Sequence, residues 1–278
     1  MRGKPQVSFM EENKNTALVT GASSGIGLAI SGELARLGYP LLMVSNEEEK
    51  LAEEARGLEA KYGIKAAPLC MDLAQKDSAQ KLFDYCQANN FKIDILVNNA
   101  GIFFFRDITD TQTERVETII NLHILTPAML SRLFAGQMIE ENRKGYILNM
   151  ASIASRMMMP GIALYSSTKS FLRCFSRAMR NEVFNKGVSI TAISPGAVAT
   201  NLYNLSSRYL KLGVRIGVII KTERFAKLAV KMMFKRKAEY IPGGFINRIF
   251  IFLVEAMPEF LVRKLKKKID KALSASRK

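Results

Sequence analysis

A glycine-rich string joins the first apolar run of the chain to its first helical pattern, and this junction constrains the fold more than any other feature. The string occupies residues 20–27 and reads Thr-Gly-Ala-Ser-Ser-Gly-Ile-Gly. Gly21 suits a tight turn, Gly25 lets backbone N–H groups approach a phosphate, and Gly27 permits close packing of helix on strand. An ordinary glycine-rich turn is the alternative, but the flanking strand and helix favour a site for a dinucleotide pyrophosphate.

The rest of the chain alternates short apolar runs with amphipathic helical patterns. Strands are predicted at 16–20, 41–44, 66–71, 93–97, 145–150, 188–194 and 239–241, and helices at 25–37, 47–62, 76–88, 113–140, 163–184, 205–212 and 222–234. Such alternation is typical of βαβ units and of a parallel sheet covered on both faces. We therefore predict an α/β fold with a Rossmann-type doubly wound sheet. One domain over 15–243 would lie between an N-terminal extension, 1–14, and a basic C-terminal helical extension, 244–278.

The overall composition is that of a globular protein with room for a sizeable core. The chain has 278 residues, of which 48% are hydrophobic and 24% charged, as in ordinary soluble domains. Its three cysteines are widely spaced, so they predict neither a disulfide framework nor a metal site. The first fifteen residues mix charges without an apolar stretch, which predicts no signal peptide. Together these features favour a reducing, cytoplasmic compartment.

A tyrosine and a lysine lie four residues apart, as Tyr165 and Lys169, in the string Tyr-Ser-Ser-Thr-Lys. On a helix this spacing places both side chains on one face. A phenol titrates near pH 10, but a nearby ammonium favours the phenolate and lowers the pKa of the phenol. The pair is therefore able to move a proton near neutral pH. An exposed i,i+4 pair is the alternative.

Several strings together resemble the short-chain dehydrogenase/reductase family, over about residues 16–200. They are the glycine string at 20–27, Asn-Asn-Ala-Gly at 98–101, Ser152, the Tyr165–Lys169 string, and Pro-Gly-Ala-Val-Ala-Thr at 195–200. Their order and spacing fit the family, including the thirteen residues from Ser152 to Tyr165. The resemblance implies an NAD(P)-dependent enzyme. A nucleotide-binding regulatory or scaffold protein on the same fold is the alternative, because fold alone does not fix function.

The resemblance also implies four catalytic residues. Tyr165 would be the general acid in ketone reduction or the base in alcohol oxidation. Lys169 would lower the pKa of Tyr165 and bond the nicotinamide ribose, and Ser152 would hold the substrate carbonyl. Asn121 would anchor a water in the proton relay.

The implied cofactor contacts follow the ends of the predicted strands. They are Gly21, Ser23, Ser24, Gly25, Ile26, Gly27, Ser45, Asn46, Asp72, Leu73, Asn99, Ala100, Gly101, Tyr165, Lys169, Pro195, Gly196, Val198 and Thr200. An acid at the end of the second strand would favour NAD, whereas a basic residue nearby would suit NADP. The chain has Ser45 and Asn46 there, which bond a phosphate without repelling it. We therefore favour NADP(H) over NAD(H).

The substrate side looks apolar. Methionines at 157–159 and phenylalanines at 103–105 fall where relatives line the substrate pocket, and methionine adapts to irregular apolar shapes. His123, the only histidine, is expected to be a packed structural residue. These features favour a hydrophobic small-molecule substrate, with a lipid as one option.

The formal net charge of +16 is concentrated near the C-terminus. From residue 211 onward there are 18 Lys/Arg and 5 Asp/Glu, an excess of 13 that leaves the first 210 residues at +3. In the tail, Phe260, Leu261, Leu265 and Ile269 alternate with Arg263, Lys264, Lys266, Lys267 and Lys268. An apolar stripe rimmed with lysine suits an anionic membrane surface. A pocket lid and a dimer contact are the alternatives, and no nucleic-acid module is visible.

The longest apolar run of the tail, Ile249 to Val254, has six residues, far fewer than the roughly 20 that span a bilayer. We therefore expect a cytoplasmic protein, with peripheral contact at the inner face of a membrane as an option. The family resemblance also implies a homodimer or homotetramer through the helices at 113–140 and 163–184.

Overall fold

A computed structural model of the chain describes residues 15–198, 219–243, 252–264 and 266–267. Seven parallel strands form one sheet in the order β3-β2-β1-β4-β5-β6-β7. They are β1 (Thr16–Thr20), β2 (Leu41–Ser45), β3 (Ala66–Cys70), β4 (Ile93–Asn98), β5 (Gly145–Met150), β6 (Val188–Ile193) and β7 (Glu239–Tyr240). The predicted helix 205–212, the extension 1–14 and Thr200 lie outside the described residues.

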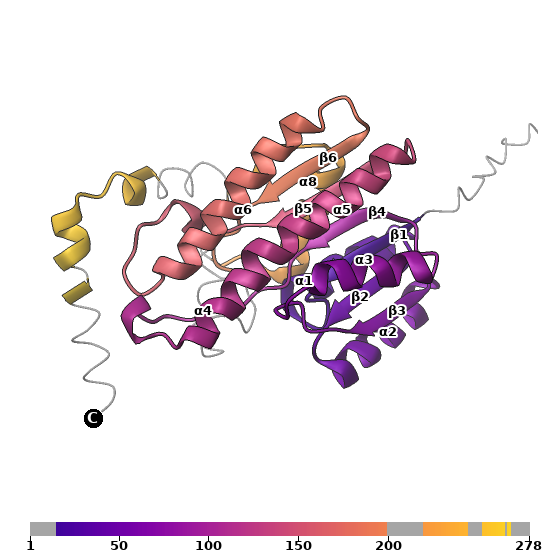
Figure 1. Cartoon of the computed structure of the whole chain (residues 1–278), viewed down its shortest axis with the longest axis horizontal. Coiled ribbons are helices and arrows are strands. Elements are labelled where there is room, and N and C mark those ends of the chain that lie inside the picture. Colours follow the sequence, from indigo (N-terminus) through magenta and orange to yellow (C-terminus); the bar gives the residue numbers. More distant parts are fainter. Residues whose placement is uncertain (1–14, 199–218, 244–251, 265, 268–278) are drawn as a thin grey trace, which may run out of the picture.

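Helices cover both faces of this sheet (Figure 1). One face packs against α1 (Gly25–Arg36), α2 (Glu48–Tyr62) and α8 (Thr222–Phe234), and the other against α3 (Ser78–Ala88), α5 (Thr126–Glu140) and α6 (Ala163–Glu182). Buried residues of the central strands alternate between the two layers: Val19 faces the first and Leu18 the second. The predicted doubly wound α/β fold is therefore confirmed. The proposed domain boundaries at 15 and 243 stay a prediction.

The predicted helix at 113–140 is interrupted. It consists of α4 (Thr113–Ile120), a π-helical turn η2 (Asn121–Leu125) and α5. Pro127 has no N–H to give to the carbonyl of His123, which helps to explain why regular α-helical bonding fails here. This stretch is long and apolar enough to pass for a membrane span, but its residues Phe134 and Met138 are fully buried in the domain.

Apart from this helix, the predicted strands and helices that the structure describes begin and end within two residues of their predicted bounds. The sheet order reverses between β1 and β4: β2 and β3 extend to one side and β5 to β7 to the other. In open α/β sheets the crevice for a ligand lies at such a switch point, outside the carboxyl ends of the strands.

Candidate active site

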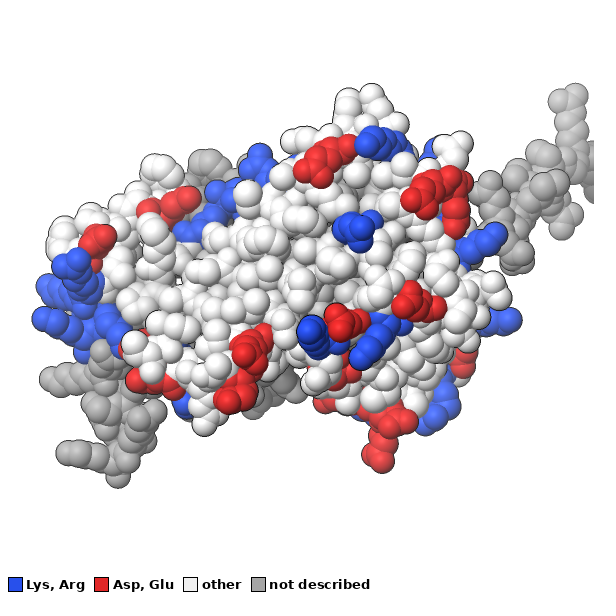
Figure 2. Space-filling model, viewed as in Figure 1, with Lys and Arg blue, Asp and Glu red and all other residues white. Residues whose placement is uncertain are grey.

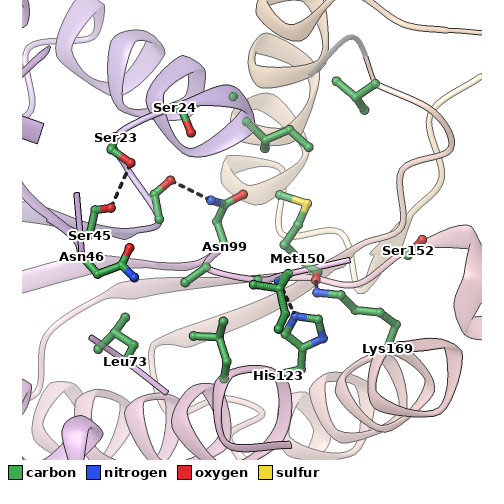
Figure 3. A pocket seen from close by; sticks show the side chains of 18 of the residues that line it. Ser23, Ser24, Ser45, Asn46, Leu73, Asn99, His123, Met150, Ser152 and Lys169 are labelled. Carbon is green, nitrogen blue, oxygen red and sulfur yellow. Dashed lines mark hydrogen bonds between the residues drawn. The ribbon is translucent and has the colours of Figure 1, made fainter. Parts of the chain in front are cut away.

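A cavity of about 420 Å³ lies at this switch point and is lined by the loops that follow β1 to β6. Figure 3 shows side chains from these loops converging on one space. The lining residues are Gly21, Ser23, Ser24, Gly25, Ile26, Ser45, Asn46, Glu47, Met71, Asp72, Leu73, Asn99, Ala100, Gly101, Ile102, Leu122, His123, Met150, Ala151, Ser152, Tyr165, Lys169, Pro195, Gly196 and Val198. Every predicted cofactor contact is among them except Gly27 and the undescribed Thr200.

The glycine turn has a backbone that other residues would not tolerate. Gly21 and Gly25 have φ angles of 64° and 55°, in the left-handed region. A Cβ atom on Gly27 would lie 2.0 Å from the carbonyl oxygen of Gly21. The absence of a side chain at Gly27 therefore lets the first turn of α1 pack directly against the backbone of Gly21. The side chain of Ser24, the N-cap of α1, makes no capping bond, so first-turn N–H groups remain available to a phosphate.

The loop after β4 is bonded directly to this turn. The hydroxyl of Thr20 accepts from the backbone N–H groups of Asn99 and Ala100, at 2.9 and 3.0 Å. The side-chain amide of Asn99 donates to the carbonyl oxygens of Thr20 and Gly21, at 3.0 and 3.2 Å. Below it, the Asn98 amide donates to Asn149 at 2.7 Å inside the core. The bonds of Thr20 and Asn99 join the ends of β1 and β4, and the Asn98–Asn149 bond joins β4 to β5.

Polar groups at the end of β2 form a small network. The Ser23 and Ser45 hydroxyls lie 2.9 Å apart, and the Ser23 hydroxyl donates to Glu47 at 2.5 Å. This bond holds the pKa of the Glu47 carboxyl below its ordinary value, with help from Lys50. A carboxylate therefore borders the cavity beside Asn46. The sequence did not predict this carboxylate, because Glu47 lies two residues beyond the end of β2.

The three residues with predicted roles in proton transfer and carbonyl binding line the same cavity. Tyr165 is in the first turn of α6 and Lys169 lies one turn later, with its Nζ 5.8 Å from the centre of the Tyr165 ring. Ser152 follows β5 and caps η3 (Ile153–Arg156), where its hydroxyl accepts from the N–H of Ala154 at 3.1 Å. The predicted helical face shared by Tyr165 and Lys169 is thus present, and neither side chain is exposed.

Burial controls the charge of Lys169. Its ammonium donates to the carbonyl oxygen of Met150 at 2.8 Å (Figure 3), and desolvation lowers its pKa from 10.5 to about 8. At pH 7 the group is still mostly protonated. It is thus a cation held inside the protein next to Tyr165, which is the environment that favours a phenolate.

Asn121 points elsewhere. Its side-chain amide donates to the carbonyl oxygen of Ala74 at 3.0 Å, in the loop after β3, and it is not among the residues that line the cavity. The side chain therefore ties the π-helical turn to the loop after β3. A role in holding a water for the proton relay stays a prediction.

Residues 15–209 match the sequence family described as short chain dehydrogenase. The chain belongs to this family. The match includes the glycine turn, the loop after β4 and the Ser152, Tyr165 and Lys169 side chains. The chain spans about 60% of the length of the first two curated relatives that it matches, which are named as reductases of Danio rerio.

Individual relatives agree with this assignment. Very-long-chain 3-oxoacyl-CoA reductase-B of Danio rerio is 35% identical over 191 residues, which are 67% of this chain and 60% of the reductase. Uncharacterized oxidoreductase YmfI of Bacillus subtilis (strain 168) is 33% identical over 237 residues, 84% of this chain and 96% of the relative. The crystal structure of a metagenomic short-chain oxidoreductase in complex with NADP is 26% identical, with a TM-score of 0.69, and covers 82% of this chain and 96% of that one.

An apolar cluster packs around Tyr165. Ile119, Ala154 and Tyr165 are its buried members, and Ile102, Phe103, Phe104, Met157, Ile162 and Leu164 pack against them. Phe103, Phe104 and Met157 thus pack around Tyr165 and do not line the cavity. The apolar substrate wall stays a prediction. Met158 points outward and is 75% exposed.

Two loops and part of the tail meet beyond this cluster. The N–H of Arg106 donates to the carbonyl oxygen of Gly161 at 2.8 Å, which joins the loop after β4 to the loop after η3. Lys266 of the tail lies 2.5 Å from Asp107, and Glu255 lies 3.8 Å from Arg156. Lys266 and Glu255 of the C-terminal segment thus contact these two regions. Such contacts agree with the pocket lid that the sequence left open as an alternative to a membrane surface.

Proposed function

We propose that this protein is an NAD(P)-dependent oxidoreductase that reduces a ketone, or oxidises the matching secondary alcohol, on a hydrophobic substrate. The observation that carries the proposal is the convergence of Ser152, Tyr165 and Lys169 on a cavity that also has the glycine turn. The uncapped N-terminus of α1 and the left-handed glycines fit a dinucleotide pyrophosphate. A bound nicotinamide dinucleotide would supply or accept the hydride.

In reduction, negative charge develops on the carbonyl oxygen as the hydride arrives. The Ser152 hydroxyl would donate a hydrogen bond to that oxygen, and Tyr165 would give it a proton, which leaves a neutral alcohol. The buried ammonium of Lys169 would stabilise the resulting phenolate until solvent returns the proton. In oxidation the same groups would act in reverse, with Tyr165 as the base.

The test is the consumption of NADPH and NADH across a panel of ketones, with the parent protein and Tyr165→Phe. The panel would include 3-oxoacyl-CoA thioesters of increasing chain length, because the zebrafish relative is named for such a substrate. This chain spans only about 60% of that relative, so its substrate can differ. The panel therefore also includes ketones that carry no CoA group. Equal rates for parent and Tyr165→Phe would contradict the mechanism.

For the cofactor, we propose NADP(H) over NAD(H). Ser24, Ser45 and Asn46 border the cavity and present neutral polar groups to a 2′-phosphate, and a solved relative binds NADP. The carboxylate of Glu47 works against this preference, because it would repel the phosphate unless it turns toward Lys50, 3.3 Å away. The test is a comparison of kcat/KM for NADPH and NADH. A higher kcat/KM for NADH would overturn the proposed preference for NADP(H).

We also propose a peripheral membrane contact, at the inner face of a membrane, through the C-terminal segment. Phe252, Leu253 and Phe260 are each at least 60% exposed, and basic side chains gather at this end of the molecule in Figure 2. Exposed Phe105 and Met158 come from the two loops that the segment contacts. Exposed apolar groups beside clustered lysines suit an anionic bilayer.

This proposal predicts binding to vesicles that contain phosphatidylglycerol, with weaker binding at high salt. Phe252→Ser with Phe260→Ser should reduce pelleting, whereas Phe184→Ser is a matched control, because Phe184 is 72% exposed at the far end of α6. Unchanged pelleting in the double variant would rule out this surface.

The oligomeric state is a further proposal. Phe171 is 38% exposed on α6 and stacks on Phe175 with ring centres 5.7 Å apart. We propose a homodimer or homotetramer through this helix and α5. Phe171→Glu should shift the mass from light scattering toward the monomer.

A further inference from the structure

The only histidine of the chain is held by three groups next to Tyr165. His123 is 1% exposed and lies in the middle of the π-helical turn η2. Its Nε2 accepts from the N–H of Ile102 at 3.0 Å, and its Nδ1 lies 3.0 Å from the Thr168 hydroxyl oxygen. The edge of its ring also contacts the Tyr165 ring, with centres 5.8 Å apart. π-helical turns often occur at functional sites.

Only one assignment of donors and acceptors satisfies the hydrogen bonds of His123. The N–H of Ile102 must donate, so Nε2 carries no proton and Nδ1 of the neutral ring carries it. The Nδ1–H group therefore donates to Thr168, whose hydroxyl proton in turn goes to the carbonyl oxygen of Tyr165 at 2.8 Å. The chain of bonds runs from the loop after β4 to the backbone of the residue that we propose as proton donor.

The surroundings leave little room for another arrangement. A Cβ atom on Gly101 would lie 2.8 Å from the Nε2 of His123, so the bond to Ile102 needs a glycine before it. Burial, followed by the charge of Lys169, lowers the pKa of His123 well below 6.5. The ring thus bridges two elements without adding a second cation beside Lys169.

We propose that His123 is a positioning residue: through Thr168 and Ile102 it fixes where Tyr165 sits relative to the loop that forms the other wall of the cavity. This inference rests on the proposed role of Tyr165 in proton transfer. Small displacements of a proton donor reduce rates strongly, by about a hundredfold per ångström in severe cases. A packed histidine without this role would contribute only to stability.

The bridge has a test that needs no substrate. Because His123 is the only histidine, ¹⁵N-histidine labelling gives one pair of ring-nitrogen signals. We expect a neutral ring with the proton on Nδ1, no titration near pH 6.5, and slow exchange of the Ile102 amide. Thr168→Val should shift the Nδ1 signal. A proton on Nε2, or titration near pH 6.5, would overturn the bridge.

The positioning role is tested by kinetics with NADPH and the best ketone of the panel. Thr168→Val removes the hydroxyl but keeps the shape, and we expect kcat to fall by about tenfold or more, with a displaced pH profile and a cofactor KM within about threefold of the parent value. Thr191→Val is the matched control, because Thr191 is fully buried and its hydroxyl has no partner among the described residues. It should leave kcat unchanged.

The outcomes separate the two proposals. If Tyr165→Phe is inactive and Thr168→Val keeps the parent kcat and pH profile, His123 is not a positioning residue, while the proposed function stands. If Tyr165→Phe keeps its activity, the proposed function fails, and with it the positioning role, even where the ring-nitrogen signals show the bridge.

Discussion

The two halves of the cavity are built in different ways. On the cofactor side, the shape depends on backbone geometry: Gly21 packs so closely on the loop after β4 that a Cβ there would lie 2.9 Å from the Cα of Ala100. On the substrate side, side chains join the loops: Lys266 pairs with Asp107, and a Cβ on Gly161 would lie 2.3 Å from the Phe105 ring. The difference teaches that backbone contacts shape the first half, whereas side chains shape the second.

The largest effect should come from the cofactor half. Gly27→Ala would place a methyl group 2.0 Å from the carbonyl oxygen of Gly21. Relief of this overlap requires a shift of the turn that costs about 3 kcal/mol, so we expect about a hundredfold weaker dinucleotide binding. Isothermal titration with NADP⁺ measures it. Gly136→Ala is the control, since nothing lies within 4 Å of its new methyl group; it should bind normally and gain about 0.5–1 kcal/mol of stability.

Lys169→Met separates stability from function at the boundary of the two halves. The variant should lose activity and be more stable than the parent at pH 7 by about 2 kcal/mol. The fully buried lysine has its pKa lowered from 10.5 to about 8, which costs about 3 kcal/mol, partly offset by its bond to Met150.

The pH dependence of this difference gives a second check. Between about pH 8 and 10.5 the unfolded parent binds the lysine proton and the folded parent does not, so the stability of the parent rises with pH in this window. The advantage of Lys169→Met should therefore be full below pH 8 and shrink above it. Urea unfolding across pH 6–10 measures both curves, and parallel curves would contradict the buried charge.

Glu47→Gln tests whether the cofactor half discriminates by charge. Removing the carboxylate should raise kcat/KM for NADPH relative to NADH by about threefold to fivefold, the scale of a solvent-screened interaction. Glu49→Gln is the control, because Glu49 is an exposed neighbour on α2 outside the cavity. An equal change in both variants would show a general charge effect rather than a contact.

The smallest effect should come from the outer surface of the substrate half. Met158→Ser should change the free energy of unfolding by less than about 0.5 kcal/mol, because Met158 is 75% exposed. Met157→Ser should be more destabilising, by about 1–3 kcal/mol, since Met157 packs in the cluster around Tyr165. Thermal unfolding of the two variants measures the contrast. Equal values would mean that Met157 contributes no more to stability than the exposed Met158.

Much of the cofactor half was predictable because its signals are local. The glycine turn, the strands beside it and the Tyr165–Lys169 spacing each depend on residues within a few positions of one another. Gly27 packs closely against the turn, as its place in the glycine string predicted, and does not line the cavity. Its contact with the cofactor stays a prediction. The interruption of the predicted helix at 113–140 was missed, although Pro127 inside the helical pattern is a sequence signal for it.

The contacts made over long separations were not predictable in the same way. The Ser23–Glu47 bond joins residues 24 positions apart, and its acid lies two residues beyond the end of β2. The His123–Thr168 contact spans 45 positions, and a buried histidine has no sequence pattern that distinguishes a bridge from simple packing.

By itself the sequence determined the doubly wound fold, the glycine turn after β1 and the helical face that Tyr165 and Lys169 share. The reason is that backbone conformation at glycine and side-chain spacing on a helix are set by neighbouring residues. Only the tertiary structure decided that Lys169 is buried with a pKa near 8, that Asn121 faces Ala74, and that the tail contacts the substrate loops. Desolvation and pairing depend on which distant segments pack together, and packing is a property of the whole fold.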